Sequence, residues 1–267
     1  MITIIELLYG LEELSLGGKP VIAHGSFKSL GAVQGGPAMV IDALLESAGA
    51  LMMPAFTYDT MVFPRIGPEQ NGVDYEVEDT LRRIVHESVP TYFTRNIPVD
   101  PEIGILSETL RRHRNAKRSL HPILSFTGVN VDFALDLQNM ENPFAPIGAL
   151  AERNGWVLLI GVDHRANTSI HYAEKLAGRR QFLRWAITPR RVIECPGFPG
   201  DSEGFQQIAS HLAKEVKAVT IGNARVEAIP LRFLLETAQN LIKEDPLALL
   251  CQREFCGRCN AVREAVI

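Results

Sequence analysis

The sequence predicts an α/β fold: a single large domain with a mostly parallel or mixed central sheet, covered by helices on both faces. The chain has 267 residues, 46% of them hydrophobic and 22% charged, which is an ordinary globular composition with enough chain for a large core. Short apolar runs bounded by glycine or proline are typical of buried strands, and they alternate with segments of helical periodicity. No internal repeat or low-complexity tract interrupts this alternation.

The amino-terminal part alternates helix and strand. We predict helices over residues 3–15 and 37–47, buried strands over 20–24 and 50–54, and a Gly- and Ser-rich loop over 25–36. Residues 57–80 follow as a long loop that contains several glycines and prolines. Loops of this length in compact domains tend to be functional.

The rest of the chain continues the alternation around one strongly apolar strand. We predict a helix over 102–113, extended segments over 125–129, 219–221 and 224–229, a buried strand over 155–162, an edge strand or hairpin over 186–194, and helices over 204–216 and 230–243. The domain spans residues 1–267, with room for a small helical, cysteine-containing appendage over 230–267.

His171 is the first candidate for catalysis. It lies in the predicted first turn of a helix, just after the buried strand, with Asn167, Thr168 or Ser169 available as the N-cap. Chemistry in open α/β sheets gathers at the carboxyl ends of strands, and the helix dipole there favours a neutral imidazole, which suits a general base. Glu174 lies on the same helical face and can orient the ring. The alternative is an ordinary half-buried histidine.

Two further segments carry groups that suit phosphate oxygens. The loop from His24 to Gly31 offers backbone N–H groups, hydroxyls and one cation between a strand and a helix, although it fits neither the P-loop nor the dinucleotide pattern. The segment from Lys117 to Pro122 has two cations beside a hydroxyl, and Phe126 offers a flat apolar surface nearby. The alternatives are an ordinary strand-to-helix loop and a solvated basic turn.

Three of the four cysteines form a C-x4-C-x2-C pattern at Cys251, Cys256 and Cys259. A zinc site would need a fourth ligand, which Cys195 or a histidine would have to supply from elsewhere in the fold. We favour reduced thiols on a terminal helix or loop, and therefore expect no metal. Cys195 itself lies among prolines and glycines with no evident base beside it, so we do not expect it to be a nucleophile.

The charge pattern excludes several partners. The net charge is -4 and the basic clusters are short, so we expect no nucleic-acid partner. No apolar run reaches the roughly 18–20 residues of a membrane-spanning helix, and no signal peptide is recognisable, so we expect a cytoplasmic protein without a membrane partner.

Taken in order, these segments resemble the aminoglycoside 3-N-acetyltransferase family. The resemblance rests on the segments 24–31, 53–57, 117–122 and 155–162, on His-Tyr-Ala-Glu at 171–174, and on Asp-Pro-Leu at 245–247 with the following Cys-x2-Cys. It implies a fold other than that of the small acetyltransferases. It also implies direct acetyl transfer from acetyl-CoA to the 3-amino group of an aminoglycoside antibiotic, in a ternary complex without an acyl-enzyme. Alternatives are another amino sugar or small amine as acceptor, or a coenzyme A-binding homologue without this activity; a homodimer is also allowed.

The resemblance also assigns site residues. The family's cofactor contacts match Ser26, Phe27, Lys28, Ser29, Leu30, Arg118 and Ser119, to which the residues alone add Gly31 and Phe126. Its catalytic histidine matches His171, and Asp59 is the nearest match to an acidic partner after the Met-Pro strand. An acid that some relatives carry beyond the histidine helix is missing or displaced to Asp201 or Glu203.

Overall fold

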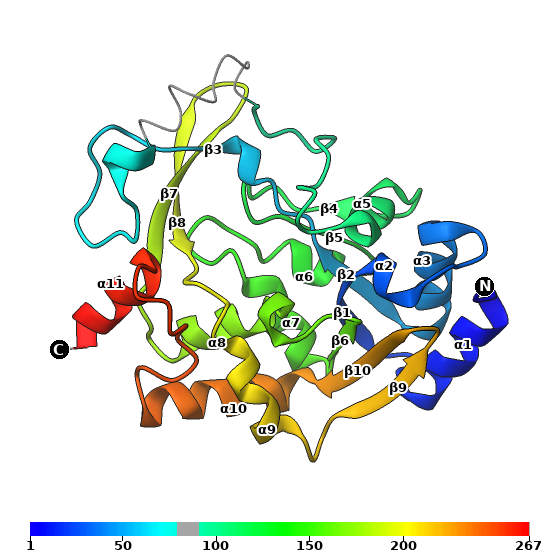
Figure 1. Cartoon of the computed structure of the whole chain (residues 1–267). Helices are drawn as coiled ribbons and strands as arrows, with labels where there is room; N and C mark the ends of the chain where they lie inside the picture. The colour runs from blue at the N-terminus through cyan, green and yellow to red at the C-terminus, as the bar shows by residue number, and fades with distance from the viewer. Residues whose placement is uncertain (79–90, 267) are drawn as a thin grey trace.

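The computed structural model describes residues 1–78 and 91–266. Its centre is a seven-stranded sheet with the order β4-β5-β2-β1-β6-β10-β9, and a separate three-stranded sheet has the order β3-β7-β8 (Figure 1). The strands of the large sheet are β1 (Pro20–Gly25), β2 (Ala50–Pro54), β4 (Lys117–Arg118), β5 (Phe126–Val129), β6 (Trp156–Ile160), β9 (Lys217–Ile221) and β10 (Ala224–Pro230).

The large sheet is mixed, as the sequence predicts. Strand β1 pairs in parallel with both β2 and β6, while β5 and β10 run antiparallel to their inner neighbours. The three parallel strands are apolar apart from His24 near the end of β1, because both of their faces are covered. Along β1, Val21 and Ala23 enter one hydrophobic cluster and Ile22 enters the other.

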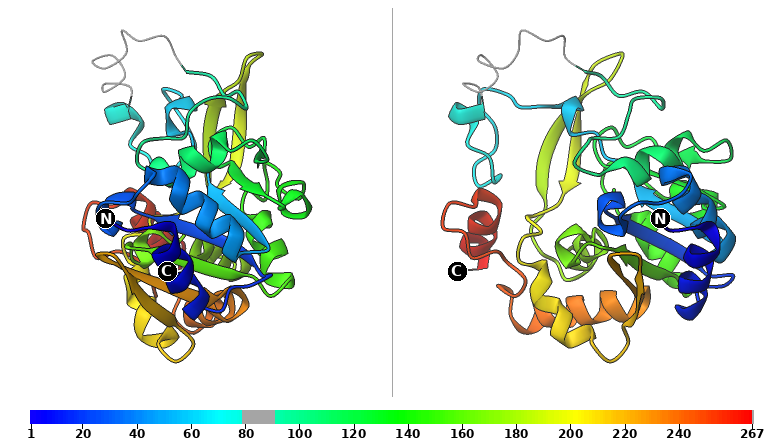
Figure 2. Two further views of the ribbon diagram at one scale, coloured as in Figure 1. Left: turned by 90° about the vertical axis from the view of Figure 1, so that its right-hand side faces the viewer. Right: turned by 45° about the vertical axis from the view of Figure 1, so that its right-hand side comes forward.

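Helices cover each face of this sheet (Figure 2). One layer consists of α1 (Ile4–Glu13), α3 (Gly36–Ser47) and α5 (Ile105–Arg112). The other consists of α6 (Asp132–Leu135), α7 (Ala145–Glu152), α8 (Ser169–Leu176) and α10 (Leu231–Glu244). Helix α10 buries Leu231, Leu234 and Ala238 in the core, so its residues are part of the packing of the main sheet.

The small sheet stands beside the large one and is built on a hairpin. Strands β7 (Phe182–Ile187) and β8 (Val192–Phe198) are antiparallel, which confirms the predicted hairpin but lengthens both arms, and β3 (Met61–Val62) pairs with β7. The carboxyl-terminal helix α11 (Gly257–Val266) lies near this sheet in Figure 1.

Several predicted elements differ in extent. The loop over 25–36 contains a short helix, α2 (Phe27–Leu30), and the helix over 102–113 begins only after Gly104, whose φ of 97° breaks a helical start. The helix over 204–216 is two short turns, η3 (Phe205–Ile208) and α9 (Ala209–Leu212), because the chain turns to begin β9 at Lys217. The loop over 57–80 holds η1 (Tyr58–Thr60) and β3, and its residues 79 and 80 lie outside the described part. Among the described residues, no helix has the length and apolar character to cross a membrane.

Candidate active site

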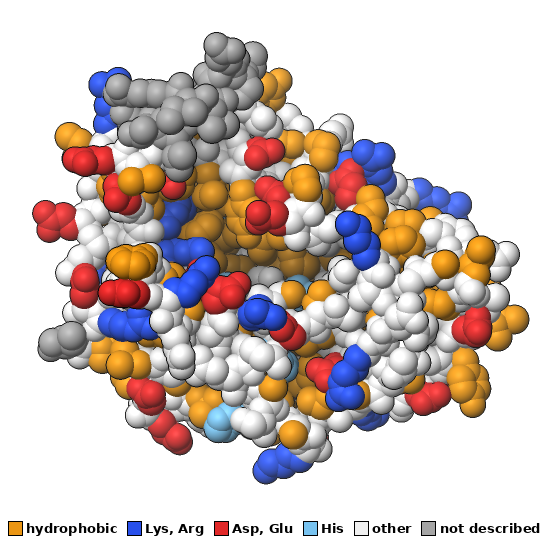
Figure 3. Space-filling view, viewed as in Figure 1, with side chains coloured by type: hydrophobic (Ala, Val, Ile, Leu, Met, Phe, Trp, Pro, Cys, Tyr) orange, Lys and Arg blue, Asp and Glu red, His pale blue; other side chains and the backbone are white. Residues whose placement is uncertain are grey.

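A cleft of about 1270 Å³ opens at the carboxyl ends of the three parallel strands. The segments that follow β1, β2 and β6 form one side of it, and the small sheet, the loop 199–203 and two carboxyl-terminal arginines form the other. Figure 3 shows the hollow, with hydrophobic side chains on its floor and both signs of charge around its rim. This is the edge at which open α/β sheets bind ligands.

His171 is the third residue of α8 and lines this cleft. The helix begins after Thr168, as expected, and the side chain of Asn167 accepts a hydrogen bond from the backbone N–H of Ser169 at 3.2 Å. The imidazole is stacked on Phe144 and meets the edge of Phe205. These rings fix its plane, since little of the side chain is left exposed.

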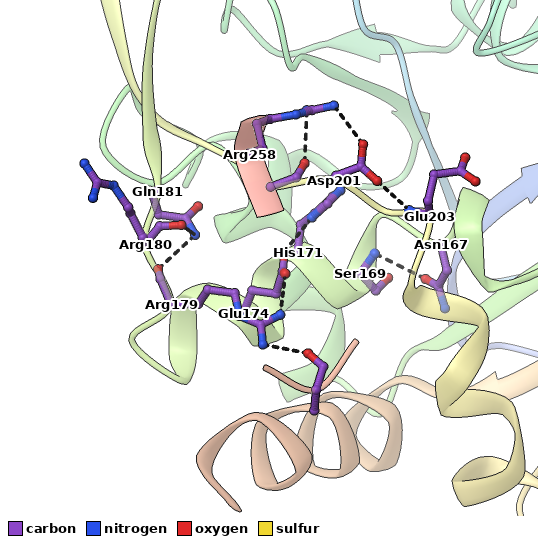
Figure 4. Close-up of polar contacts among 12 residues, drawn as sticks. Asn167, Ser169, His171, Glu174, Arg179, Arg180, Gln181, Asp201, Glu203 and Arg258 are labelled. Carbon is purple, nitrogen blue, oxygen red and sulfur yellow. Dashed lines mark hydrogen bonds and ion pairs between the residues drawn. The ribbon is translucent and has the colours of Figure 1, made fainter. Parts of the chain in front are cut away.

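A chain of buried charged groups stands behind the imidazole (Figure 4). Nδ1 of His171 lies 2.7 Å from Oε2 of Glu174, and the other oxygen of Glu174 accepts a hydrogen bond from Nη1 of Arg179 at 2.9 Å. Nη2 of Arg179 donates to the carbonyl oxygens of Pro246 and Ala248 at 2.8 and 2.7 Å. Arg179 comes from beyond the helix, and neither it nor the two carbonyls was singled out from the sequence.

This arrangement fixes the chemistry open to the histidine. Because a carboxylate occupies Nδ1, that nitrogen carries the proton in the neutral ring, and Nε2 is the acceptor. A neutral acceptor nitrogen on the wall of a cleft can remove a proton from a bound group. The buried carboxylate then stabilises the imidazolium, as the acid does in serine-protease triads.

The loop after β1 contributes a second part of the cleft wall. Ser26, Phe27 and Lys28 line the cleft, with Lys28 exposed. Ser29 lines a neighbouring cavity of about 770 Å³, which shares Val162, Arg165 and Ala166 with the cleft.

Ser29, Leu30 and Gly31, at the end of this loop, pack against the rest of the protein. The Ser29 hydroxyl donates to the carbonyl of Ser26 at 2.6 Å and packs on Gly161, where an added Cβ would lie only 1.8 Å from Oγ. Leu30 is buried in the core and Gly31 has a φ of 87°. Neither Leu30 nor Gly31 is among the described residues that line the cleft.

Arg118, Ser119 and Phe126 are buried in the interior, although all three were expected to contact a cofactor. The Arg118 guanidinium donates to the carbonyl of Ala55 and the hydroxyl of Ser125 at 2.6 and 3.0 Å. Its burial lowers the pKa of Arg118 to about 10, so it is still a cation at neutral pH. The Ser119 hydroxyl accepts the N–H of Phe126 at 2.8 Å. The structure does not bring these residues to the cleft; Arg118 instead holds Ala55, which lies between the cleft-lining residues Pro54 and Phe56.

Some acidic residues near the site line the cleft and others do not. Asp59 is exposed on η1 and is not among the described residues that line the cleft. Asp163 pairs with Arg165 at 2.7 Å beside the second cavity. The carboxylates on the wall of the cleft are Asp74, Glu78, Glu102, Asp201 and Glu203.

His24 is a cleft residue that the sequence did not single out as chemical. It is the penultimate residue of β1, it is buried, and its Nε2 has no hydrogen-bond partner among the described residues. Burial lowers the pKa of His24 to about 3, which keeps the ring neutral. The available signal was its position at the end of a strand whose next residues enter the cleft.

The fold and the cleft define a mixed α/β protein with a polar site at the carboxyl ends of its parallel strands. The family model for aminoglycoside 3-N-acetyltransferase matches residues 22–243. The chain therefore belongs to the aminoglycoside 3-N-acetyltransferase family, as the sequence motifs indicate.

Similar proteins agree in fold and in family. Aminoglycoside N(3)-acetyltransferase IV of Salmonella sp is 30% identical over 175 residues, a match that covers 61% of this chain and 56% of that protein, a little over half its length. The crystal structure of the apoenzyme of aminoglycoside acetyltransferase AAC(3)-IVa has a TM-score of 0.79 and 26% identity, and covers 99% of this chain and 98% of that one. A histidine-to-alanine variant of that enzyme, in complex with a gentamicin, has a TM-score of 0.75 at 25% identity, and covers 98% of this chain and 97% of that one.

Proposed function

We propose that this protein transfers an acetyl group from acetyl-CoA to the 3-amino group of an aminoglycoside. The observation that carries this proposal is the His171–Glu174 pair on the wall of a cleft of about 1270 Å³. Pockets for a single drug-sized ligand measure roughly 300–1,000 Å³, so the cleft is larger than the usual pocket for one small ligand. Family membership and the gentamicin complex of a similar enzyme support the choice of acceptor.

His171 acts as the general base. Its Nε2 takes a proton from the acceptor amine as the amine nitrogen attacks the thioester carbonyl carbon. The new amide bond forms as the bond from carbon to sulfur breaks, and coenzyme A leaves as the thiolate. Glu174 holds the ring and stabilises the imidazolium, and Arg179 holds Glu174.

Acetyl-CoA fits the side of the cleft formed after β1. Ser26 and Lys28 offer a hydroxyl and a cation to its phosphates or its pantetheine arm, and Phe27 offers apolar surface. The adjoining cavity lined by Ser29 gives a long cosubstrate a path out of the cleft. Arg118 supports the site from the interior by fixing Ala55.

The acceptor fits the cleft because several carboxylates line it. Asp74, Glu102 and Glu203 come from three different segments of the chain and line the cleft. Several separated carboxylates suit a ligand with several ammonium groups better than one with a single amine. They position the reacting amine, which lowers the barrier by orientation.

The proposal is tested by turnover of the purified protein with acetyl-CoA and a panel of amines: gentamicin, apramycin, glucosamine and a simple monoamine. Thiol release gives the rate, and mass spectrometry with NMR gives the acetylated position. We expect acetylation of the 3-amino group of at least one aminoglycoside, and intersecting initial-velocity lines for a ternary complex. A preference for glucosamine or the monoamine would indicate that an amino sugar or small amine, and not an aminoglycoside, is the acceptor. No turnover of any amine would overturn the proposal.

A further inference from the structure

Four potential metal ligands meet beside the cleft: Asp201, Cys251, Cys256 and Cys259. One ligand atom from each lies within 4.8 Å of all the others. Asp201 follows β8, Cys251 follows α10, Cys256 directly precedes α11 and Cys259 lies in its first turn. Cys256 is partly exposed and the other three are buried.

The donor set and its geometry are those of a structural zinc site. Zinc in such sites is tetrahedral and is bound by thiolates, imidazoles or carboxylates. Bonds of about 2.3 Å place tetrahedral ligands about 3.8 Å apart. The four atoms need to contract by no more than about 1 Å to reach that spacing. Three thiolates also favour zinc over hard cations such as Mg²⁺ and Ca²⁺.

The fourth member of the cluster is neither Cys195 nor a histidine, the two candidates that the sequence offered. Cys195 lies within β8 and is buried, and its burial raises the pKa of its thiol to about 12. Asp201 takes its place in the cluster, and no spacing rule links an aspartate some 50 residues upstream to a C-x4-C-x2-C pattern. The sequence alone therefore could not complete the set.

Two arginines surround the cluster as outer partners. Nη2 of Arg253 lies 2.7 Å from Oδ2 of Asp201, and Nη2 of Arg258 lies 3.4 Å from the same oxygen. A zinc ion with three thiolates and a carboxylate carries a formal charge of about −2, which two guanidinium groups offset. The N–H of Glu203 also donates to Oδ1 of Asp201 at 3.0 Å, which fixes the orientation of the carboxylate.

We propose that Asp201, Cys251, Cys256 and Cys259 bind one Zn²⁺ ion. The ion ties residues 251–259 to the loop 199–203, which forms a wall of the cleft. Its role is structural, because it closes a contact between two segments far apart in the chain and its four protein ligands complete a tetrahedral set with no open position. The proposal does not depend on which acceptor the enzyme uses.

The test measures metal in the full-length protein, expressed with added zinc and purified without chelator. Elemental analysis should give about one zinc per chain in the wild type and in Cys195→Ser, the matched control for loss of a buried cysteine outside the cluster. Cys256→Ser should lose most of the metal, and Asp201→Asn should bind zinc more weakly in competition with a chromogenic chelator. Removal of zinc should lower the midpoint of thermal unfolding by several degrees.

A second measurement uses only the wild type, so the test still holds if the variants fail to fold. Wild-type protein exchanged with Co²⁺ should show the absorption of thiolate-to-cobalt charge transfer and of a tetrahedral ion. Wild-type protein without stoichiometric zinc or that cobalt spectrum would overturn the proposal. In that case, four titratable thiols per denatured chain would indicate a reduced thiol cluster, and two would indicate a disulfide.

Discussion

Nδ1 of His171 and Oε2 of Glu174 lie 2.7 Å apart within one turn of α8. The separation of three residues places both side chains on one face of the helix, so the pair forms wherever this helix forms. The partner that holds Glu174 is Arg179, which follows the end of the helix. His171 and Glu174 are thus close together in the chain, whereas the residues that hold Glu174 are not.

Replacement of His171 by alanine should abolish the base. We expect kcat to fall by roughly 100- to 10,000-fold while the affinity for acetyl-CoA changes little. Steady-state kinetics and calorimetry check the two quantities. His211→Ala, an exposed histidine on α9, is the control and should keep its activity. Near-normal turnover of His171→Ala would remove the histidine from the mechanism.

Glu174→Gln keeps the shape of the side chain but removes the negative charge that we propose stabilises the imidazolium. We expect kcat to fall by roughly 10- to 1,000-fold, within the range for loss of acid–base support. It should also cost about 3–5 kcal/mol of stability, because Arg179 is left buried without its anion. The double variant Glu174→Gln with Arg179→Met should recover stability but not turnover. Recovery of both would show that Glu174 acts only in folding.

Substitutions of Lys28 and Arg118 should have different effects, the first on coenzyme A binding and the second on stability. Lys28→Ala removes an exposed cation from the cleft and should weaken coenzyme A binding by up to about 1.5–3 kcal/mol, the value of one charge-assisted hydrogen bond. Its thermal unfolding should be unchanged. Arg118→Ala should instead lower the unfolding midpoint, since it removes a buried guanidinium that donates to the hydroxyl of Ser125 and to the carbonyls of Ala55 and Ile97. Calorimetry measures the affinity for coenzyme A, and thermal scans measure the unfolding midpoint. If Arg118→Ala weakened coenzyme A binding without lowering the unfolding midpoint, Arg118 would belong to the cofactor site.

Acceptor binding should depend on salt and on the carboxylates of the cleft. Added salt should raise KM for a gentamicin-like acceptor, since the Debye length is only about 8 Å at physiological ionic strength. Glu203→Gln should raise this KM several-fold. Asp59→Asn is the matched control, because Asp59 is exposed outside the cleft-lining residues and its loss should leave kcat and KM unchanged. A loss of turnover in Asp59→Asn would instead support Asp59 as an acidic partner of His171.

The free energy of unfolding should decrease as the pH falls, because of His121, a buried histidine that is not among the residues lining the cleft. The Nδ1 atom of His121 accepts the N–H of Leu124 at 2.9 Å, and burial lowers the pKa of His121 to about 4. An unfolded histidine titrates near 6.5, so the unfolded chain binds the proton first as pH falls. The stabilisation is complete above about pH 6.5 and is lost towards pH 4.

His121→Asn keeps an acceptor but cannot titrate. Its free energy of unfolding, measured by urea titration from pH 7 to 4, should therefore fall less steeply than that of the wild type, by an amount on the order of a few kcal/mol over the range. His211→Asn should follow the wild-type slope. Equal slopes for His121→Asn and wild type would contradict the assignment.

The sequence predicted those parts of the site that depend on short-range pattern. The apolar runs of β1, β2 and β6 gave the parallel centre, and the first-turn position of His171 gave its pairing with Glu174. It could not tell the buried Arg118 from an arginine that faces a phosphate, because both occur beside hydroxyls. It also missed the role of Arg179, whose partners at 246 and 248 are distant in the chain. The strand β3 has only two residues, too few to show the alternation of apolar and polar residues by which a strand is predicted from sequence.

The hydrogen bonds from Arg179 to Pro246 and Ala248 also set an order of events during protein synthesis. Chains fold from the amino terminus as they leave the ribosome, at about 5–20 residues per second. His171, Glu174 and Arg179 emerge well before the two carbonyls that complete their support. Until residue 248 has been made, the guanidinium has no fixed anchor at that end. A nascent chain stalled before this point would contain His171 and Glu174 but not the two carbonyls that anchor Arg179 behind them.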